Sequence, residues 1–421
     1  MNRQISPSIT LPKKLSFSHV HKETLSNGLS VHIIEGTSQN IFQLNILFPA
    51  GRLYESKRML AGICASAILK GTKKHTAAQL AESFDFHGAT IKFQANMYTA
   101  QLSLFCLSEK LGLVLPLLID VLQNAIFPLE ELRKIKVKSK QKLAVQWEKN
   151  SYIASQYFNQ AIFGENKPFG YLSRAQDIDK ISQNDAINHY NKHYQLSANS
   201  VVIAAGKIGA TEMKILQDNL GQLSLKDKVS PSCSFQTSAK TLIELERKNS
   251  LQSAIRVGMP FVNIHDTDFD DAQILNTILG GYFGSRLMSN IREEKGFTYG
   301  IYSFINPILN HSYFCISTEV GAQFKKDTLK EIEFEINRLH NERISDEELS
   351  MVKNYMVGQL MKSVDGPLSM IGTLKNFLIF DLDLEVINKQ LSNIHAVKAV
   401  RLQELAQQYL DFNKMIKVTT G

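Results

Sequence analysis

Residues 280 to 302 read GGYFGSRLMSNIREEKGFTYGIY, and they carry the local signals that organise the second half of this chain. The two glycines that begin the stretch end an apolar helix predicted over residues 269–279. Ser285 is a candidate N-cap for a second helix, and Gly296 follows that helix as a left-handed C-terminal residue. A strand is predicted from Thr298 to Phe304, because β-branched and aromatic residues are dense there.

Arg292 lies at the end of the second predicted helix, and Tyr299 lies seven residues later, at the start of the strand. A tight turn between them lets a guanidinium and a phenol point into one space. The same spacing also fits a surface arginine paired with Glu294 and a tyrosine that fills the edge of a core. Spacing alone leaves both interpretations open.

The order of these motifs resembles the C-terminal half-signature of the insulinase and pitrilysin-like metallopeptidases, the inverzincin clan. A glycine-rich turn, Ser-Arg-Leu, Ile-Arg-Glu and Gly-x-x-Tyr follow one another here as they do in that family. The resemblance implies that Arg292 and Tyr299 are the family's arginine–tyrosine pair. In that role the tyrosine donates to the oxyanion of the tetrahedral intermediate and the arginine holds the peptide, so that pre-placed donors stabilise the transition state.

Composition excludes several other classes of protein. The chain has 421 residues, 44% of them hydrophobic, which is consistent with two domains. Its net charge of +7 comes from dispersed lysines, without the basic stripe and interleaved aromatics of a nucleic-acid-binding surface. The densest basic run, Arg133 to Lys142, is predicted to be helical. No apolar run approaches the ~18 residues of a membrane span.

The N-terminal residues and the cysteines favour a cytoplasmic protein. The first 14 residues contain no apolar segment of the kind found in secretory signals. Cys64, Cys106, Cys233 and Cys315 are scattered without C-x-x-C spacing, so we expect reduced, structural thiols.

The order of predicted elements recurs: strands, two helices, two strands and then further helices, in each half. This recurrence predicts an α+β fold with two homologous domains, each a mainly antiparallel sheet covered by helices. The expected boundaries are residues 1–220, a linker at 221–239, and residues 240–421. Predicted helices of the later part of each half cover residues 110–124, 129–149, 152–163, 327–341, 346–363, 367–380 and 395–410. A hairpin turn is predicted at Asn27-Gly28, helix N-caps at Thr76 and Ser345, and a strand that includes Tyr98-Thr99. The family resemblance extends over residues 22–417 and implies the same two domains, closing like a clamshell with a partner subunit.

The family's metal motif is missing from this chain. In the family, H-x-x-E-H lies on a helix after a strand that ends in Ala-Gly; two histidines bind zinc and the glutamate is the general base. Anchored on Ala50-Gly51, on Glu55 and on Lys70-Gly71-Thr72, the matching positions are Gly62, Ala65 and Ser66. None of these residues can bind zinc or take a proton from water.

A third metal ligand, the family's distal glutamate, falls on or beside Lys142, whose ammonium has no lone pair to offer. His189 and His193 have the i,i+4 spacing of two ligands, but no carboxylate lies beside them, and we interpret the segment as an ordinary surface helix. We therefore expect no metal or cofactor in this chain, and zinc in a partner subunit.

A chain that keeps the arginine–tyrosine half and lacks the zinc half resembles the non-catalytic subunit of heterodimeric family members. We expect a substrate-binding subunit that supplies Arg292 and Tyr299 to a zinc-bearing sister, which cleaves peptides. A second hypothesis is a non-proteolytic pseudoprotease that binds peptides or acts as a scaffold, as a homodimer. A third, an enzyme active by itself, requires a metal site that the sequence does not reveal.

Overall fold

The computed structural model describes residues 11–17, 19–36, 39–228 and 235–421. The chain forms two compact units. Among the described residues, the first unit contains those between 19 and 243 together with residues 365–379, and the second contains residues 11–17, 244–364 and 380–421. Two segments therefore pack with the half of the chain that is distant from them in sequence.

The first unit is built on a six-stranded sheet with the order β1-β2-β6-β3-β5-β4. Its strands are β1 (Val20–Thr24), β2 (Ser30–Glu35), β3 (Ile41–Phe48), β4 (Thr90–Ala95), β5 (Ala100–Leu107) and β6 (Val201–Gly206). All neighbouring pairs are antiparallel except β2 and β6, which are parallel. The predicted Asn27-Gly28 hairpin joins β1 to β2, and Gly28 has the positive φ of 85° that such a turn favours.

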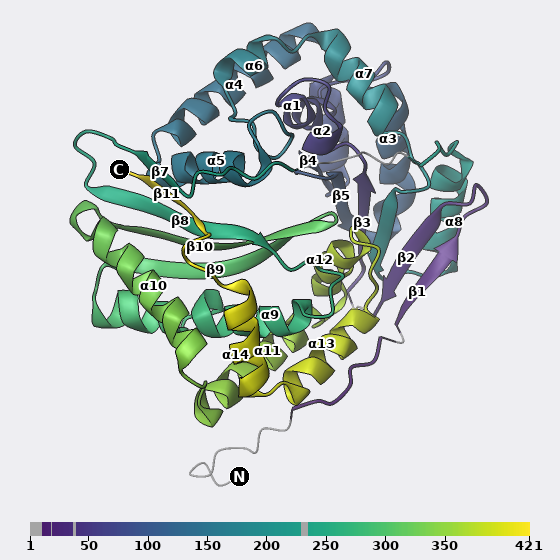
Figure 1. Ribbon diagram of the computed structural model, residues 1–421. Coiled ribbons are helices and arrows are strands. Elements are labelled where there is room, and N and C mark those ends of the chain that lie inside the picture. Colours follow the sequence, from purple (N-terminus) through teal and green to yellow (C-terminus); the bar gives the residue numbers. More distant parts are fainter. Residues whose placement is uncertain (1–10, 18, 37–38, 229–234) are drawn as a thin grey trace. The chain divides into compact units, whose positions relative to one another are not determined.

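The helices of this unit pack against its sheet or against one another (Figure 1). They are α1 (Leu60–Ala67), α2 (Ala77–Phe86), α3 (Leu111–Asn124), α4 (Leu129–Trp147), α5 (Asn150–Phe163), α6 (Ala175–Asp179), α7 (Gln183–His193), α8 (Ala210–Asn219) and α12 (Pro367–Leu378). Thr76 caps α2 as predicted, since its side chain accepts a hydrogen bond from the backbone N–H of Gln79. The sequence did not predict α6 or α8.

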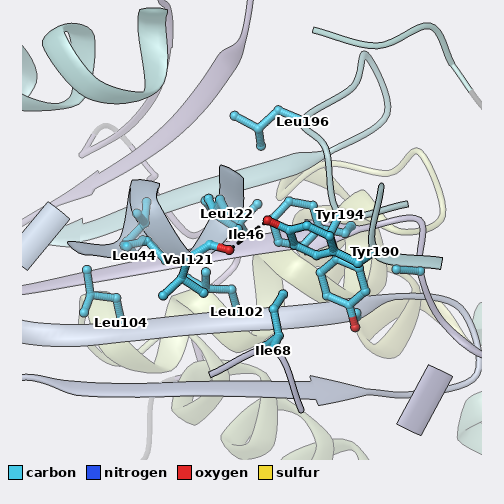
Figure 2. Packing of buried hydrophobic residues seen from close by; sticks show 14 of the residues in the cluster. Leu44, Ile46, Ile68, Leu102, Leu104, Val121, Leu122, Tyr190, Tyr194 and Leu196 are labelled. Atoms are coloured by element: carbon cyan, nitrogen blue, oxygen red, sulfur yellow. Dashed lines mark hydrogen bonds between the residues drawn. The ribbon is translucent and has the colours of Figure 1, made fainter. Parts of the chain in front are cut away.

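The core of the first unit lies between its sheet and its helices. Figure 2 shows Tyr190 of α7 and Tyr194, the residue after α7, among aliphatic side chains of β3, β5 and α3. The Tyr190 hydroxyl donates to the backbone carbonyl of Val121 at 2.9 Å, which satisfies its one polar atom in this apolar setting.

Strand β6 is buried on both of its faces. Val202 and Ala204 belong to the core just described, whereas Ile203 and Ala205 alternate with them and point to the opposite face. Both of these side chains are nevertheless fully buried, because α12 packs against β6. A helix from late in the sequence thus covers the second face of the first unit's sheet.

The second unit has a five-stranded sheet with the order β7-β11-β8-β10-β9. Its strands are β7 (Leu242–Leu245), β8 (Gln252–Phe261), β9 (Thr298–Ile308), β10 (His311–Gly321) and β11 (Ile416–Thr420). Its helices are α9 (Phe269–Asn276), α10 (Lys325–Asn341), α11 (Asp346–Ser363), α13 (Glu385–Ala396) and α14 (Ala399–Tyr409), with the π-helical segments η4 (Thr277–Gly281) and η5 (Met288–Glu294). The predicted α+β class is confirmed.

Two local predictions in this unit were wrong. The helix expected over residues 395–410 begins only at Ala399, as α14, after the extended residues Val397 and Lys398, and the preceding helix α13 was not predicted. Ser285 does not act as an N-cap through its side chain, since its buried hydroxyl has no hydrogen-bond partner among the described residues. Ser345 does cap α11, because its hydroxyl accepts from the backbone N–H of Glu348 at 3.1 Å.

Within the described ranges no helix is both long and apolar enough to cross a bilayer. Cys64, Cys106 and Cys315 are buried free thiols, as expected from their spacing. Cys233 and part of the expected linker lie outside the described residues.

Candidate functional site

The glycine-rich turn of residues 280–284 is held close to strand β9. A Cβ added to Gly280 would lie 2.6 Å from Oγ and 2.8 Å from the backbone nitrogen of Ser303, so only glycine fits at this position. Arg286, which follows the turn, is buried and donates through Nε and Nη2 to the Glu348 carboxylate, at 2.8 Å each. The turn is therefore fixed at both ends, against β9 and against the start of α11.

Arg292 lies in the last turn of the π-helical segment η5 and beside the first residues of β9. Its Nε donates to the backbone carbonyl of Tyr299 at 3.0 Å, and its guanidinium carbon lies 4.4 Å from the centre of the Phe283 ring. Nη1 lies 3.5 Å from the carboxylate of Glu293, not of Glu294. Gly296 makes this turn possible, because it takes the left-handed conformation, φ 65°, that the sequence predicted.

Tyr299 does not fill the edge of a core: its side chain is 95% exposed. It borders a surface hollow of about 620 Å³ over the sheet, which Arg256, Phe297, Tyr302 and Glu319 also line. Arg292 is not among the lining residues. The structure thus links the two predicted site residues through a hydrogen bond from the Arg292 side chain to the Tyr299 backbone, and of the two only Tyr299 lines the hollow.

The metal-motif positions lie on α1, as the alignment predicts. Gly62 and Ser66 are exposed, and the Ser66 hydroxyl donates to the Gly62 carbonyl at 2.8 Å inside the helix. Ala65, at the position of the general base, is buried. The Ser66 hydroxyl is already bonded within its own helix, and Gly62 and Ala65 have no side-chain atom that could bind a metal or accept a proton. These three residues therefore do not fit a zinc site or a catalytic base.

Lys142 is exposed on α4, which packs against α1. The helix that carries the third metal position is therefore beside the other two, as a shared site requires, but it offers an ammonium in place of a carboxylate. No group of three or more histidine, cysteine, aspartate or glutamate side chains in the described part of the chain is arranged to hold a metal ion.

A half-buried carboxylate anchors the start of α1. Glu55 accepts hydrogen bonds from the backbone N–H groups of Met59 and Ala61, at 3.1 Å each, and from the Tyr171 hydroxyl. Arg52 lies over the Tyr171 ring, 3.4 Å from its centre. Burial raises the pKa of Glu55 despite these bonds. This group orders the backbone of α1, and sequence reasoning used Glu55 only as an alignment anchor.

His189 and His193 are not on a surface, contrary to the prediction. They are 4% and 5% exposed, and their ring centres lie 4.9 Å apart. The His189 Nε2 donates to the backbone carbonyl of Ala50 at 3.2 Å. Burial lowers the pKa of each to about 4, with the charge of His189 contributing for His193. Both are neutral core residues at neutral pH. The apolar residues of α7 were the feature of the sequence that could have indicated this burial.

Tyr98 and Thr99 lie in the turn between β4 and β5 and not in a strand. Their backbone N–H groups donate to the side chain of Asn96, at 2.8 Å each. Strand β4 lies at one of the two edges of this sheet and has a free side at which an added strand could pair; β1 forms the other edge.

The comparisons with known proteins agree with this architecture. A family model described as insulinase (peptidase family M16) matches residues 31–172, and one described as peptidase M16 inactive domain matches residues 180–356. The chain is 24% identical over 396 residues to "uncharacterized zinc protease YmxG" of Bacillus subtilis, covering 92% of this chain and 95% of that protein. It is 24% identical over 397 residues to "non-peptidase homolog YmxG" of Helicobacter pylori, covering 89% and 90%.

A solved structure, the peptidase M16 inactive domain from Pseudomonas fluorescens, shares the fold with a TM-score of 0.86. It is 22% identical in sequence, and the match covers 96% of this chain and 98% of that one.

Proposed function

The chain belongs to the insulinase family, peptidase family M16, and we propose that it is the substrate-binding subunit of a heterodimeric zinc metallopeptidase. It is itself a non-catalytic member of the family, since glycine, alanine, serine and lysine occupy the metal and base positions. In this proposal a homologous sister subunit supplies the zinc and the general base, and this chain supplies Arg292 and Tyr299.

The exposure of Tyr299 is the observation that carries the proposal. A tyrosine kept for packing would bury its ring, yet this one is 95% exposed and its hydroxyl bonds to no described residue of the chain. Its backbone, in contrast, is held by Arg292 and by the turn at Gly296. A tyrosine whose hydroxyl is free and whose backbone is fixed is suited to bind a molecule outside the chain.

The chemistry proposed for Tyr299 is donation of its hydroxyl proton in a hydrogen bond to the oxyanion formed when a peptide carbonyl is attacked. A donor already in position stabilises that charge without reorganisation. Arg292 orients the strand that carries the phenol, and its Nη2, which has no partner among the described residues, is left to bind a carbonyl of the peptide.

The test is peptide hydrolysis by this chain reconstituted with a zinc-bearing relative from the same cell. We expect Tyr299→Phe to lower kcat by about 10² or more, since one oxyanion donor is lost, and Arg292→Ala to lower kcat/KM. Tyr302→Phe, a change of the neighbouring exposed tyrosine on the same strand, is the matched control and should have little effect. Unchanged hydrolysis in both Tyr299→Phe and Arg292→Ala would show that the assigned roles are wrong.

A second candidate function is a non-proteolytic pseudoprotease that binds peptides or acts as a scaffold, as a homodimer. The Helicobacter pylori relative named as a non-peptidase homolog favours it. Purification from the native cell separates the two proposals: a zinc-bearing relative of similar size that purifies with the chain supports the heterodimer, and a homodimer without such a relative supports the scaffold.

A further inference from the structure

Helix α4 carries an excess of positive charge that the proposed function does not use. Its sequence, LEELRKIKVKSKQKLAVQW, has no acidic residue after Glu131. Two of its lysines turn toward α6. Lys140 lies 2.7 Å from the Asp179 carboxylate, and the Lys136 ammonium donates to the backbone carbonyls of Asp179 and Ile181. These two charges are compensated within the unit.

The remaining cations of α4 are exposed to solvent. Lys134, Lys138 and Lys142 follow one another at four-residue intervals and therefore share one side of the helix, about 6 Å apart along its axis. Lys134 pairs with Glu131 at 2.6 Å. The side chains of Lys138, Lys142 and the nearby Arg133 form no ion pair or hydrogen bond with any residue that the structure describes. The row is thus only partly neutralised.

Apolar side chains are exposed on the same side. Val145 is 60% exposed and Val137 is 47% exposed, and helical spacing places Val145 between the positions of Lys134 and Lys138 around the axis. Surfaces that bind single-stranded nucleic acid combine cations with aromatic rings on which bases stack. The one aromatic residue of α4, Trp147, donates its indole N–H to the carbonyl of Ser173 and lies under Arg174. Lysines among aliphatic side chains favour a peptide partner.

The spacing of the lysine row matches an extended peptide. Alternate side chains of a strand point the same way and repeat about every 6.7 Å, close to the ~6 Å of the row. The difference accumulates to only about 1.4 Å over the row, which flexible lysine side chains absorb. Helix α1, which packs against α4, presents Gly62 and Ser66 at exposed positions, and the space beside Gly62 is open.

We propose that the exposed side of α4 binds an extended acidic peptide, with carboxylates at alternate positions over Lys134, Lys138 and Lys142 and an aliphatic contact to Val145. The inference rests on the proposed peptide-binding function, and it specifies the class of peptide. Lys142, at the position of the family's distal glutamate, becomes a contact for a carboxylate of the peptide.

The experiment measures binding of a fluorescein-labelled peptide, ten residues of alternating glutamate and valine, to the full chain by fluorescence anisotropy. We expect tighter binding than for a peptide of the same composition with its glutamates in one block. Lys138→Glu/Lys142→Glu should weaken binding tenfold or more, and added salt should weaken it in the wild type because exposed charges are screened. The matched control is Lys22→Glu/Lys214→Glu, an equal change in net charge at exposed lysines on β1 and α8 of the same unit.

Three results would overturn the proposal: equal binding by the Lys138→Glu/Lys142→Glu variant, an equal loss in the control variant, or tighter binding of a 20-nucleotide single-stranded DNA than of the alternating peptide. Circular dichroism establishes that each variant is folded. The assay needs no sister subunit and no hydrolysis. A failure here therefore leaves the result for Tyr299 untouched, and a failure of the hydrolysis test leaves this binding result interpretable.

Discussion

The paired histidines of α7 predict that the protein loses stability in mild acid. Burial holds the pKa of His189 and His193 at about 4 in the folded chain, whereas both return to about 6.5 on unfolding. Between these values the unfolded state binds more protons. Stability is therefore complete above pH ~6.5, falls as the pH decreases from ~6.5 to ~4, and stops falling from this cause below ~4.

The size of the effect follows from the two pKa differences. A difference of about 2.5 corresponds to about 3 kcal/mol for each histidine. The two ring centres are only 4.9 Å apart, so the first proton opposes the second and the two losses do not simply add. We expect a combined loss of about 3 to 6 kcal/mol, which is a large part of the 5–15 kcal/mol that stabilises a typical domain.

Urea unfolding at pH 7.5, 6.0 and 4.5 measures this loss, followed by the fluorescence of Trp147. Trp147 is the single tryptophan, and it belongs to the same unit as the histidines. The comparison variant is His189→Gln/His193→Gln, in which the glutamine at 189 keeps an N–H for the carbonyl of Ala50. We expect this variant to be less stable than the wild type at pH 7.5 and to depend less on pH. If the free energy of unfolding changed with pH in the same way in both proteins, the histidines would titrate normally in the folded state and the reasoning would be refuted.

Three further predictions concern the turn, a helix start and the lost metal site. Gly280→Ala should cost about 1–3 kcal/mol, because the new methyl group collides with β9; an unchanged Tm would contradict that contact. Ser345→Ala should cost about 1 kcal/mol through loss of the α11 cap, measured by urea unfolding, and no loss would mean that the cap is replaced by water. Gly62→His/Ser66→His/Lys142→Glu should bind zinc at about one ion per chain by metal analysis, whereas the variant without Lys142→Glu should bind it more weakly. Equal zinc content in that triple variant and the wild type would show that these positions do not share a site.

The sequence alone predicted the features that depend on neighbouring residues. The caps at Thr76 and Ser345 involve backbone groups three residues away, and the turns at Gly28 and Gly296 depend on the freedom of glycine at positive φ. Helix and strand periods gave the α+β class for the same reason. The prediction of an N-cap at Ser285 was wrong. The local sequence suits a cap, but the Ser285 hydroxyl makes no hydrogen bond to a described residue, and a π-helical segment begins three residues later.

Features that depend on distant residues needed the tertiary structure. The continuous apolar run of β6 indicates burial on both faces. It does not predict which helix covers the second face, and that helix, α12, begins more than 160 residues later. The i,i+4 spacing of His189 and His193 is the same on a surface helix and a buried one. Only their packing beneath Ala50 makes them neutral core residues. The motif that indicated the family also predicted Tyr299 as a site residue. The exposure of the Tyr299 side chain, however, depends on the position of β9 at the edge of its sheet. Local chemistry thus determined the elements and the missing metal ligands of this protein, and long-range packing decided which side chains face solvent.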